Sequence, residues 1–277
     1  MANTVKRKTQ LTRESTEATG RKNEKKIIIF KTSDNMADFV IAQWKTISER
    51  AIKEKGCFSV ALSGGKTPVF LYKKLSHKKT LPWDKTYIFQ TDERFVPYQD
   101  KENNFHMISD MLLNKIGIPR ENVYPISTAE DASQLSAERY ERNLRSFFEV
   151  NAKPPRFDLV LLGIGQDGHT ASLFPAAQAV KERKRLAVAT APLNKKENER
   201  ITITFPVINN AENVMFLVTG NRKAKIVKEV IDDTCDLLPA SMVKPESGKL
   251  FFLLAESAGS LLKNLNRRRG YMKVKIN

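Results

Sequence analysis

The chain has 277 residues, of which 41% are hydrophobic, and a formal net charge of +16. This length fits one large α/β domain or two small ones, with enough apolar residues for a sizeable core. No apolar run reaches the roughly 18 residues that a membrane span requires, and the N-terminus lacks the apolar segment of a secretory signal. The two cysteines, Cys57 and Cys235, have no spacing typical of a zinc site or a disulfide scaffold, so we expect a protein of the reducing cytoplasm.

The positive charge is concentrated at the two ends of the chain. Residues 1–31 contain nine Lys or Arg and three Glu, and residues 263–277 contain six Lys or Arg and no acid, which gives each end a net charge of +6. We therefore predict a domain at residues 25–265, between a disordered basic tail at 1–24 and a basic tail at 266–277. Such tails can bind nucleic acid or anionic surfaces, but solvated ends are more common, and we do not expect a nucleic-acid partner.

Predicted strands and helices alternate along most of the chain. The periodicity of residues 33–55 indicates a helix that has Ser33 or Asp34 as its N-cap and ends at Gly56. Strands are predicted at residues 26–30, 57–62, 86–90, 157–162, 186–190, 200–205, 213–219 and 249–254. Further helices are predicted from 68 to 75, at 102–116, 132–150 and 222–232, and after 256. This order favours a single-domain, three-layer Rossmann-like α/β sandwich with a mainly parallel sheet and helices on both faces.

The first candidate site segment follows the strand at residues 57–62 and reads Ser63-Gly64-Gly65-Lys66-Thr67-Pro68. Ligands bind at the carboxyl ends of strands in open α/β sheets, and glycines let a backbone approach a ligand closely. With a helix start behind it, the segment is a candidate phosphate cradle in which the hydroxyls of Ser63 and Thr67 are within reach. The alternative is a turn without a ligand. The spacing is not that of a Walker loop.

Three charged residues, Asp92, Glu93 and Arg94, follow the strand at residues 86–90. Either carboxylate could orient a base or bind sugar hydroxyls, and Arg94 could hold a phosphate or polarise a carbonyl. The alternative is a surface turn with an ion pair. Two later basic residues, Arg200 at the start of a strand and Lys223 after one, could also reach an anionic substrate, although each could equally be an ordinary exposed residue.

The third candidate segment, residues 163–169, reads Gly-Ile-Gly-Gln-Asp-Gly-His after a strongly apolar strand. His169 is one of three histidines, and a histidine in this setting can act as a general base near neutral pH. Asp167 could orient its ring, and Gly165 is one of three glycines in the same segment. The alternative is a histidine with a purely structural role. Because the glycine spacing departs from that of a dinucleotide loop, we do not expect a nicotinamide cofactor.

These segments, in this order, resemble the 6-phosphogluconolactonase family over about residues 27–255. The residues that carry the resemblance are 63–68, 92–97, 163–175, 200–204, 220–224 and 238–241, and the most specific string is Asp167-Gly168-His169-Thr170-Ala171-Ser172-Leu173-Phe174-Pro175. Two features depart from the family pattern, since it has Trp and Asp near Phe252 and Ala255, and Asn104-Phe105-His106-Met107 is a variant segment. Neither departure falls on the candidate site residues.

The resemblance implies hydrolysis of 6-phospho-D-glucono-1,5-lactone without a metal or cofactor. It implies that His169 activates water, that Asp167 orients His169, and that the substrate is held by Ser63, Gly64, Gly65, Lys66, Thr67, Asp92, Arg94, Gly165, Arg200 and Lys223. Whether Arg94 binds the phosphate or the oxyanion stays open. The substrate is then the expected partner, and the protein is expected to be a monomer or a weak homodimer.

Two other functions are compatible with parts of the sequence. Related glucosamine-6-phosphate deaminases share the Asp-Gly-His loop but continue with Ala-Phe-Asn-Glu-Pro, whereas residues 171–175 read Ala-Ser-Leu-Phe-Pro and lack the Glu. A protein that binds nucleic acid or anionic surfaces through its basic tails is the second alternative, and it predicts strongly salt-dependent binding.

Overall fold

The computed structural model describes residues 25–151, 153–191, 198–232, 235, 237–262 and 271–276. Within them, eight strands form one parallel sheet in the order β11-β1-β10-β9-β6-β2-β3-β5. The strands are β1 (Lys25–Phe30), β2 (Phe58–Leu62), β3 (Thr86–Gln90), β5 (Val123–Tyr124), β6 (Leu159–Leu162), β9 (Asn213–Val218), β10 (Lys249–Ala255) and β11 (Tyr271–Ile276). The order changes direction between β6 and β2, next to the centre of the sheet.

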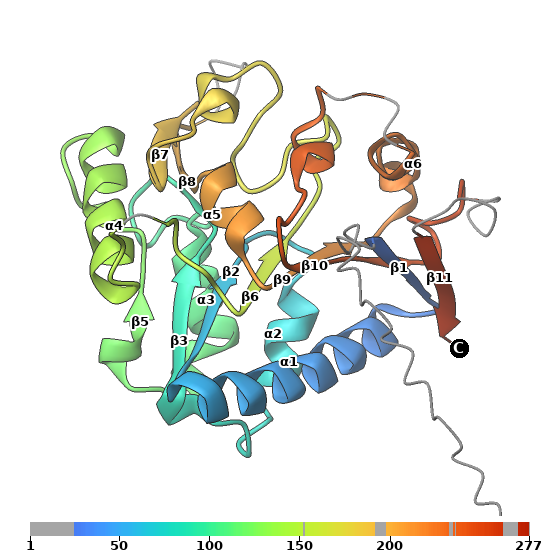
Figure 1. Ribbon diagram of the computed structural model, residues 1–277, viewed down its shortest axis with the longest axis horizontal. Helices are drawn as coiled ribbons and strands as arrows, with labels where there is room; N and C mark the ends of the chain where they lie inside the picture. Colours follow the sequence, from blue (N-terminus) through green and yellow to red (C-terminus); the bar gives the residue numbers. More distant parts are fainter. Residues whose placement is uncertain are drawn as a thin grey trace, which may run out of the picture.

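Helices cover both faces of this sheet (Figure 1). The α-helices are α1 (Ser33–Lys55), α2 (Val69–Leu75), α3 (Asn104–Met111), α4 (Ser133–Phe147), α5 (Phe205–Asn210) and α6 (Ala224–Ile231). Short 3-10 helices lie at Trp83–Lys85, Leu113–Lys115, Arg120–Asn122, Gln178–Lys181, Asn221–Lys223 and Pro239–Met242. The first three α-helices share one core cluster with the sheet, and the last three share the other.

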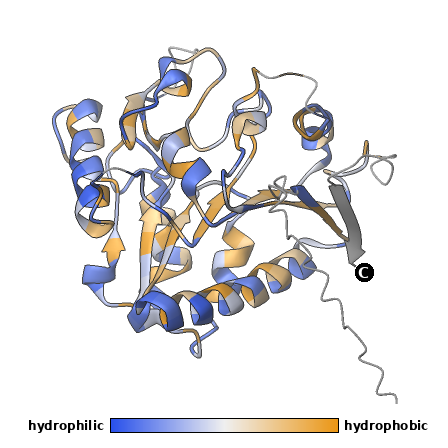
Figure 2. Ribbon diagram, viewed as in Figure 1, coloured by the Kyte–Doolittle hydropathy of each residue, from blue (hydrophilic) through white to orange (hydrophobic). Residues whose placement is uncertain are grey.

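Successive side chains along each strand point to opposite faces of the sheet, and this alternation explains the two core clusters. In β6, Leu159 and Leu161 belong to the cluster beneath α1, whereas Val160 and Leu162 belong to the cluster beneath α4. All four side chains are buried, as in a parallel sheet covered on both faces. Figure 2 shows the apolar centre of the sheet and the polar outer faces of the helices. The predicted α/β fold class, with a mainly parallel sheet, is confirmed.

Helix α1 starts and ends close to its predicted bounds. Its N-cap is Thr32, one residue before the predicted Ser33 or Asp34, and its hydroxyl oxygen accepts a hydrogen bond from the backbone N–H of Asn35 at 3.1 Å. Gly56 ends the helix in the left-handed region, with φ of 82°, as the sequence predicted.

A second, antiparallel sheet lies beside the first and was not predicted. It consists of β4 (Asp92–Arg94), β8 (Arg200–Ile203) and β7 (Ala187–Thr190), with β8 in the middle. The predicted strand at residues 200–205 ends earlier because helix α5 begins at Phe205, with Pro206 in its first turn, where a missing N–H costs nothing. This sheet orients the residues that follow β3.

The C-terminal part also differs from the sequence prediction. Residues 256–262 form turns where a helix was predicted, and the rest of that predicted helix lies outside the described residues. Strand β11 pairs with β1 and extends the sheet into residues 266–277, which the sequence had placed in a tail. The predicted N-terminal tail lies outside the described residues. None of the described helices is long and apolar enough to cross a membrane.

Candidate active site

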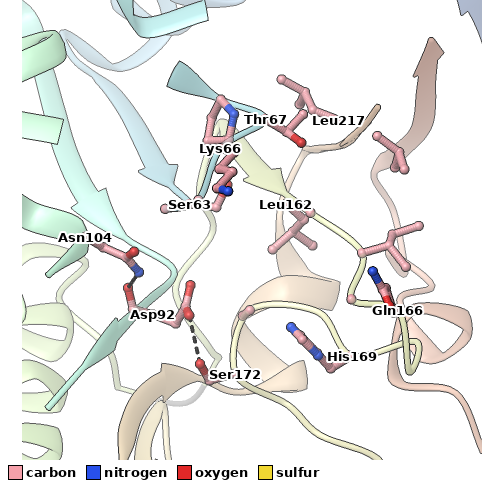
Figure 3. A pocket seen from close by; sticks show the side chains of 18 of the residues that line it. Ser63, Lys66, Thr67, Asp92, Asn104, Leu162, Gln166, His169, Ser172 and Leu217 are labelled. Atoms are coloured by element: carbon pink, nitrogen blue, oxygen red, sulfur yellow. Dashed lines mark hydrogen bonds between the residues drawn. The ribbon is translucent and has the colours of Figure 1, made fainter. Parts of the chain in front are cut away.

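A cavity of about 360 Å³ opens where β2, β6, β9 and β4 end or begin (Figure 3). Its size is in the range of small-molecule sites. Its walls include Ser63, Gly64, Gly65, Lys66, Thr67, Asp92, Arg94, Asn104, Gly165, Gln166, His169, Ser172, Phe174, Arg200, Thr219 and Lys223. Many of the polar residues lie in loops that meet because parallel strands end at the same edge of the sheet. Asp92, Arg94 and Arg200 belong instead to strands of the antiparallel sheet.

His169 and Asp167 form a hydrogen-bonded pair in the loop after β6. His169 Nδ1 lies 2.6 Å from Asp167 Oδ1, and the backbone N–H of His169 donates to the same oxygen at 3.2 Å. The His169 ring packs beside Phe174, with centroids 4.8 Å apart. Its side chain is 33% exposed and lines the cavity, and Figure 3 shows the ring directed toward the space between Asp92 and Leu162.

The loop backbone leaves little freedom for this pair. The N–H of Gly165 donates to the carbonyl oxygen of His169 at 2.8 Å, which closes a tight turn. A Cβ added to Gly165 would lie 2.2 Å from His169 Nδ1 and 2.5 Å from Asp167 Oδ1. Gly168 has φ of 84°, which favours glycine, and a Cβ added there would lie 2.7 Å from Leu238 Cδ2. The two glycines therefore allow the His169 and Asp167 side chains to pack closely against the backbone of their own loop.

Burial, hydrogen bonds and nearby charges shift two pKa values at this loop. Partial burial tends to raise the pKa of the Asp167 carboxyl, but the hydrogen bonds and charge of His169 lower it below its usual value. The pKa of Lys223 is lowered because the amine is partly buried, and the negative charge of Asp167 offsets this only in part. Asp167 is therefore ionised at neutral pH, close enough to Lys223 for their charges to interact.

Two arginines face each other across the antiparallel sheet. Arg94 in β4 is the register partner of Arg200 in β8, and both line the cavity. One guanidinium nitrogen of Arg94 donates to the backbone oxygen of Glu102 at 2.7 Å, while its buried Nε has no partner among the described residues. Like charges directly opposite each other are unfavourable, so this placement indicates an anion-binding wall.

The loop at residues 63–68 forms another part of the cavity wall. Ser63 is buried and its carbonyl oxygen accepts a hydrogen bond from the Tyr72 hydroxyl at 2.6 Å, whereas Lys66 is exposed. The Thr67 and Thr219 hydroxyl oxygens are 3.1 Å apart, which joins this loop to the one that leads to Lys223. A cation and several hydroxyls therefore surround one end of the cavity.

The three charged residues after β3 have different environments. Asp92 is buried at the cavity wall and accepts hydrogen bonds from the hydroxyls of Ser172 at 2.8 Å and Thr91 at 3.0 Å. Glu93 does not line the cavity and is fully buried, and this burial raises its carboxyl pKa to about 7. Its role is structural support of α3, so the idea that Glu93 itself contacts a ligand finds no support in the cavity walls.

The structure brings together almost all of the residues selected from the sequence. All of them line the cavity except Asp167, which contacts His169, and Glu93, which is buried outside the cavity lining. Sequence reasoning did not select Asn104, Ser172 or Thr219, although the first two lie in segments compared with the family. Among the described residues, no group of three or more His, Cys, Asp or Glu side chains could hold a metal ion.

A family model described as glucosamine-6-phosphate isomerases/6-phosphogluconolactonase matches residues 31–252. The chain belongs to this family. Within it, the chain groups with the 6-phosphogluconolactonases, which are carboxylic ester hydrolases.

Curated relatives and solved structures agree on this branch. A 6-phosphogluconolactonase of Nostoc sp. is 41% identical over 77% of this chain and 88% of the relative. A probable 6-phosphogluconolactonase 2 of Oryza sativa subsp. indica is 38% identical over 87% and 91%. The structure of 6-phosphogluconolactonase from Trypanosoma brucei has a TM-score of 0.77 and 30% identity, and the match covers 87% of this chain and 99% of that one. A monomeric glucosamine-6-phosphate deaminase, 19% identical with a TM-score of 0.69, shares the fold.

Proposed function

We propose that this protein hydrolyses 6-phospho-D-glucono-1,5-lactone to 6-phospho-D-gluconate, with His169 as the general base. The observation that carries the proposal is the His169–Asp167 pair at 2.6 Å on the wall of a cavity lined by cations. Relatives that are named 6-phosphogluconolactonase support the same reaction.

The pair fixes the proton on one side of the imidazole. An ionised carboxylate only accepts hydrogen bonds, so the ring nitrogen that faces Asp167 must carry the proton. In the neutral ring, Nε2 then holds a lone pair. Asp167 also stabilises the imidazolium that forms when Nε2 takes up a proton, as a carboxylate behind a catalytic histidine does in general. The geometry therefore suits a base that acts through Nε2.

In the proposed reaction, Nε2 of His169 removes a proton from water while the water oxygen attacks C1 of the lactone. The carbonyl electrons move to oxygen and give a tetrahedral oxyanion. When this intermediate collapses, the bond between C1 and the ring oxygen breaks, and the imidazolium returns its proton to that oxygen. The ring opens to a carboxylic acid and a free hydroxyl, and the acid loses its proton to solvent.

The cations are assigned to the phosphate. The loop at residues 63–67 offers backbone N–H groups and hydroxyls, and Arg200 and Lys223 supply positive charge. Arg94 is the cross-strand neighbour of Arg200, and we assign it to the same phosphate, because two opposed guanidinium groups can share one anion.

The proposal is tested by measuring lactone hydrolysis, corrected for the spontaneous rate, in the wild type and in His169→Ala. A general base contributes roughly 10²–10⁴-fold, so kcat should fall by about that factor while the far-UV CD spectrum is unchanged. A wild-type rate in His169→Ala would contradict the mechanism. Ammonia release from glucosamine 6-phosphate, measured in parallel, would identify a deaminase instead. The absence of a carboxylate at residues 171–175 disfavours that activity.

A further inference from the structure

Asn104, the first residue of α3, reaches into the cavity beside the candidate phosphate loop (Figure 3). Its side chain is almost fully buried, with 3% of the residue exposed. Nδ2 donates a hydrogen bond to the backbone oxygen of Asp92 at 3.0 Å. Because a backbone carbonyl can only accept, this contact fixes which end of the amide is nitrogen and which is oxygen.

The other end of the amide, Oδ1, lies over Gly64. A Cβ built on Gly64 would be 1.8 Å from Oδ1, so the amide occupies the space that a side chain at position 64 would need. Among the described residues, no hydrogen bond to Oδ1 is made. This oxygen is not one of the fully buried side-chain atoms without a partner, so it remains accessible from the cavity that Asn104 lines. A group on a bound ligand can therefore donate a hydrogen bond to it.

The chemistry of Oδ1 limits which ligand groups can form a hydrogen bond with it. An amide oxygen accepts hydrogen bonds and donates none. A phosphate dianion and a developing oxyanion are also acceptors, so neither can satisfy it. A hydroxyl group on a sugar ring can donate to Oδ1, and it could accept from a different neighbour at the same time. Asn104 is thus suited to a part of the substrate that the cations do not bind.

Glu93 holds Asn104 in place. Its carboxylate accepts the backbone N–H groups of Asn104 and Phe105, both at 2.7 Å, at the first turn of α3. It also accepts from the side chain of Gln90 and the backbone of Arg94, both at 2.8 Å. Four hydrogen bonds to one buried carboxylate leave the start of α3 little freedom, and a polar group held this firmly loses little entropy when it binds a ligand.

We propose that Asn104 is a specificity-determining residue whose Oδ1 accepts a hydrogen bond from a ring hydroxyl of the substrate, and that Glu93 is the positioning residue that holds it. This proposal rests on the proposed lactonase function. Asp92 and Asn104 together then recognise the hydroxyl pattern of the ring, while the arginines and the loop at residues 63–67 bind the phosphate.

The test compares wild type with Asn104→Leu, which has nearly the same volume but no acceptor, on the parent lactone and on its 2-, 3- and 4-deoxy analogues. We expect kcat/KM for the parent to fall about tenfold in the variant, mainly through KM, because one hydrogen-bonding group is left without its partner. Wild type should discriminate against one deoxy analogue by a similar factor, and Asn104→Leu should have lost that discrimination.

The matched control is Asn103→Ala. Asn103 is the N-cap of α3 and accepts from the backbone N–H of His106 at 2.8 Å, but it does not line the cavity. Its replacement should lower Tm without raising KM. If Asn103→Ala raises KM as much as Asn104→Leu, the effect comes from the helix and the proposal is overturned. Unchanged kcat/KM and unchanged discrimination in Asn104→Leu also overturn it, whereas an inactive wild type refutes the lactonase function itself.

Discussion

Replacement of Gly165 by alanine should disable the catalytic pair while leaving the fold intact. Gly165 has no left-handed φ, so its backbone conformation is open to alanine. The new methyl group, however, would lie 2.2 Å from His169 Nδ1 and 2.5 Å from Asp167 Oδ1. Both members of the hydrogen-bonded pair stand on the side where the methyl group points, so neither can keep its position.

The expected loss in kcat follows from the distance by which the His169 ring must move away from the new methyl group. To reach ordinary contact at 3.4 Å, the His169 ring must retreat by about 1.2 Å. A misplacement of about 1 Å at a reacting group costs on the order of 10²-fold in rate. We therefore expect kcat for lactone hydrolysis to fall about 100-fold in Gly165→Ala. KM should change little, because the residues proposed to bind the phosphate lie in other segments of the chain.

The assay is lactone hydrolysis under saturating substrate, with thermal unfolding measured on the same preparations. Gly117→Ala is the matched control, because a Cβ there meets no atom within 4 Å and the residue is outside the cavity. It should keep wild-type kcat and Tm. If Gly165→Ala turns over at the wild-type rate, the position of the His169–Asp167 pair does not limit catalysis and the reasoning fails.

Four further variants test other residues in and around the site. Asp167→Asn keeps the shape of the side chain but removes the negative charge that fixes the imidazole proton. We expect kcat to fall by at least about tenfold while KM stays unchanged. An equal loss in kcat and in affinity for the substrate would contradict an orienting role. Arg94→Gln and Arg200→Gln should each raise KM and reduce the rise in Tm caused by 6-phosphogluconate, whereas a loss confined to kcat in Arg94→Gln would assign Arg94 to the oxyanion. The folded-state pKa of Glu93, about 7, exceeds its ordinary value of 4.5, so the folded protein binds more protons between these pH values. Its free energy of unfolding should fall as pH rises from 4.5 to 7, by about 1.4 kcal/mol per pKa unit at most, and urea titrations should show a flatter dependence in Glu93→Gln.

The sequence predicts the main sheet well because its strands are buried on both faces. The near-continuous apolar runs at β6 and β9 leave little alternative. The antiparallel sheet was harder to predict, since β4 consists of Asp92, Glu93 and Arg94 and has no apolar pattern. Helix α5 was hidden because the alternation of apolar and polar residues that forms β8 continues through Thr204 to Phe205, so no change of pattern marks the start of the helix.

The same contrast holds for the site. His169 and Asp167 are two residues apart, so their contact could be predicted from the loop alone. The direction of Glu93 depends on how β4 pairs with β8, and this pairing cannot be derived from local sequence. The contact of Asn104 with Gly64 joins residues 40 positions apart, and it requires the position of α3 relative to β2. Sequence reasoning therefore found the local His169–Asp167 pair and did not select Asn104, whose position depends on tertiary packing.

Strand β11 belongs both to the basic C-terminal segment and to the main sheet, so removing that segment removes a strand together with its positive charges. It pairs with β1 along six register positions, so β1 lies between two neighbours and is not an edge. A truncated protein that lacks residues 266–277 would expose the backbone N–H and C=O groups of β1, which invites association between molecules. Any loss of binding to anionic surfaces after such a truncation would therefore mix two causes, and replacement of the lysines within an intact strand is the way to separate them.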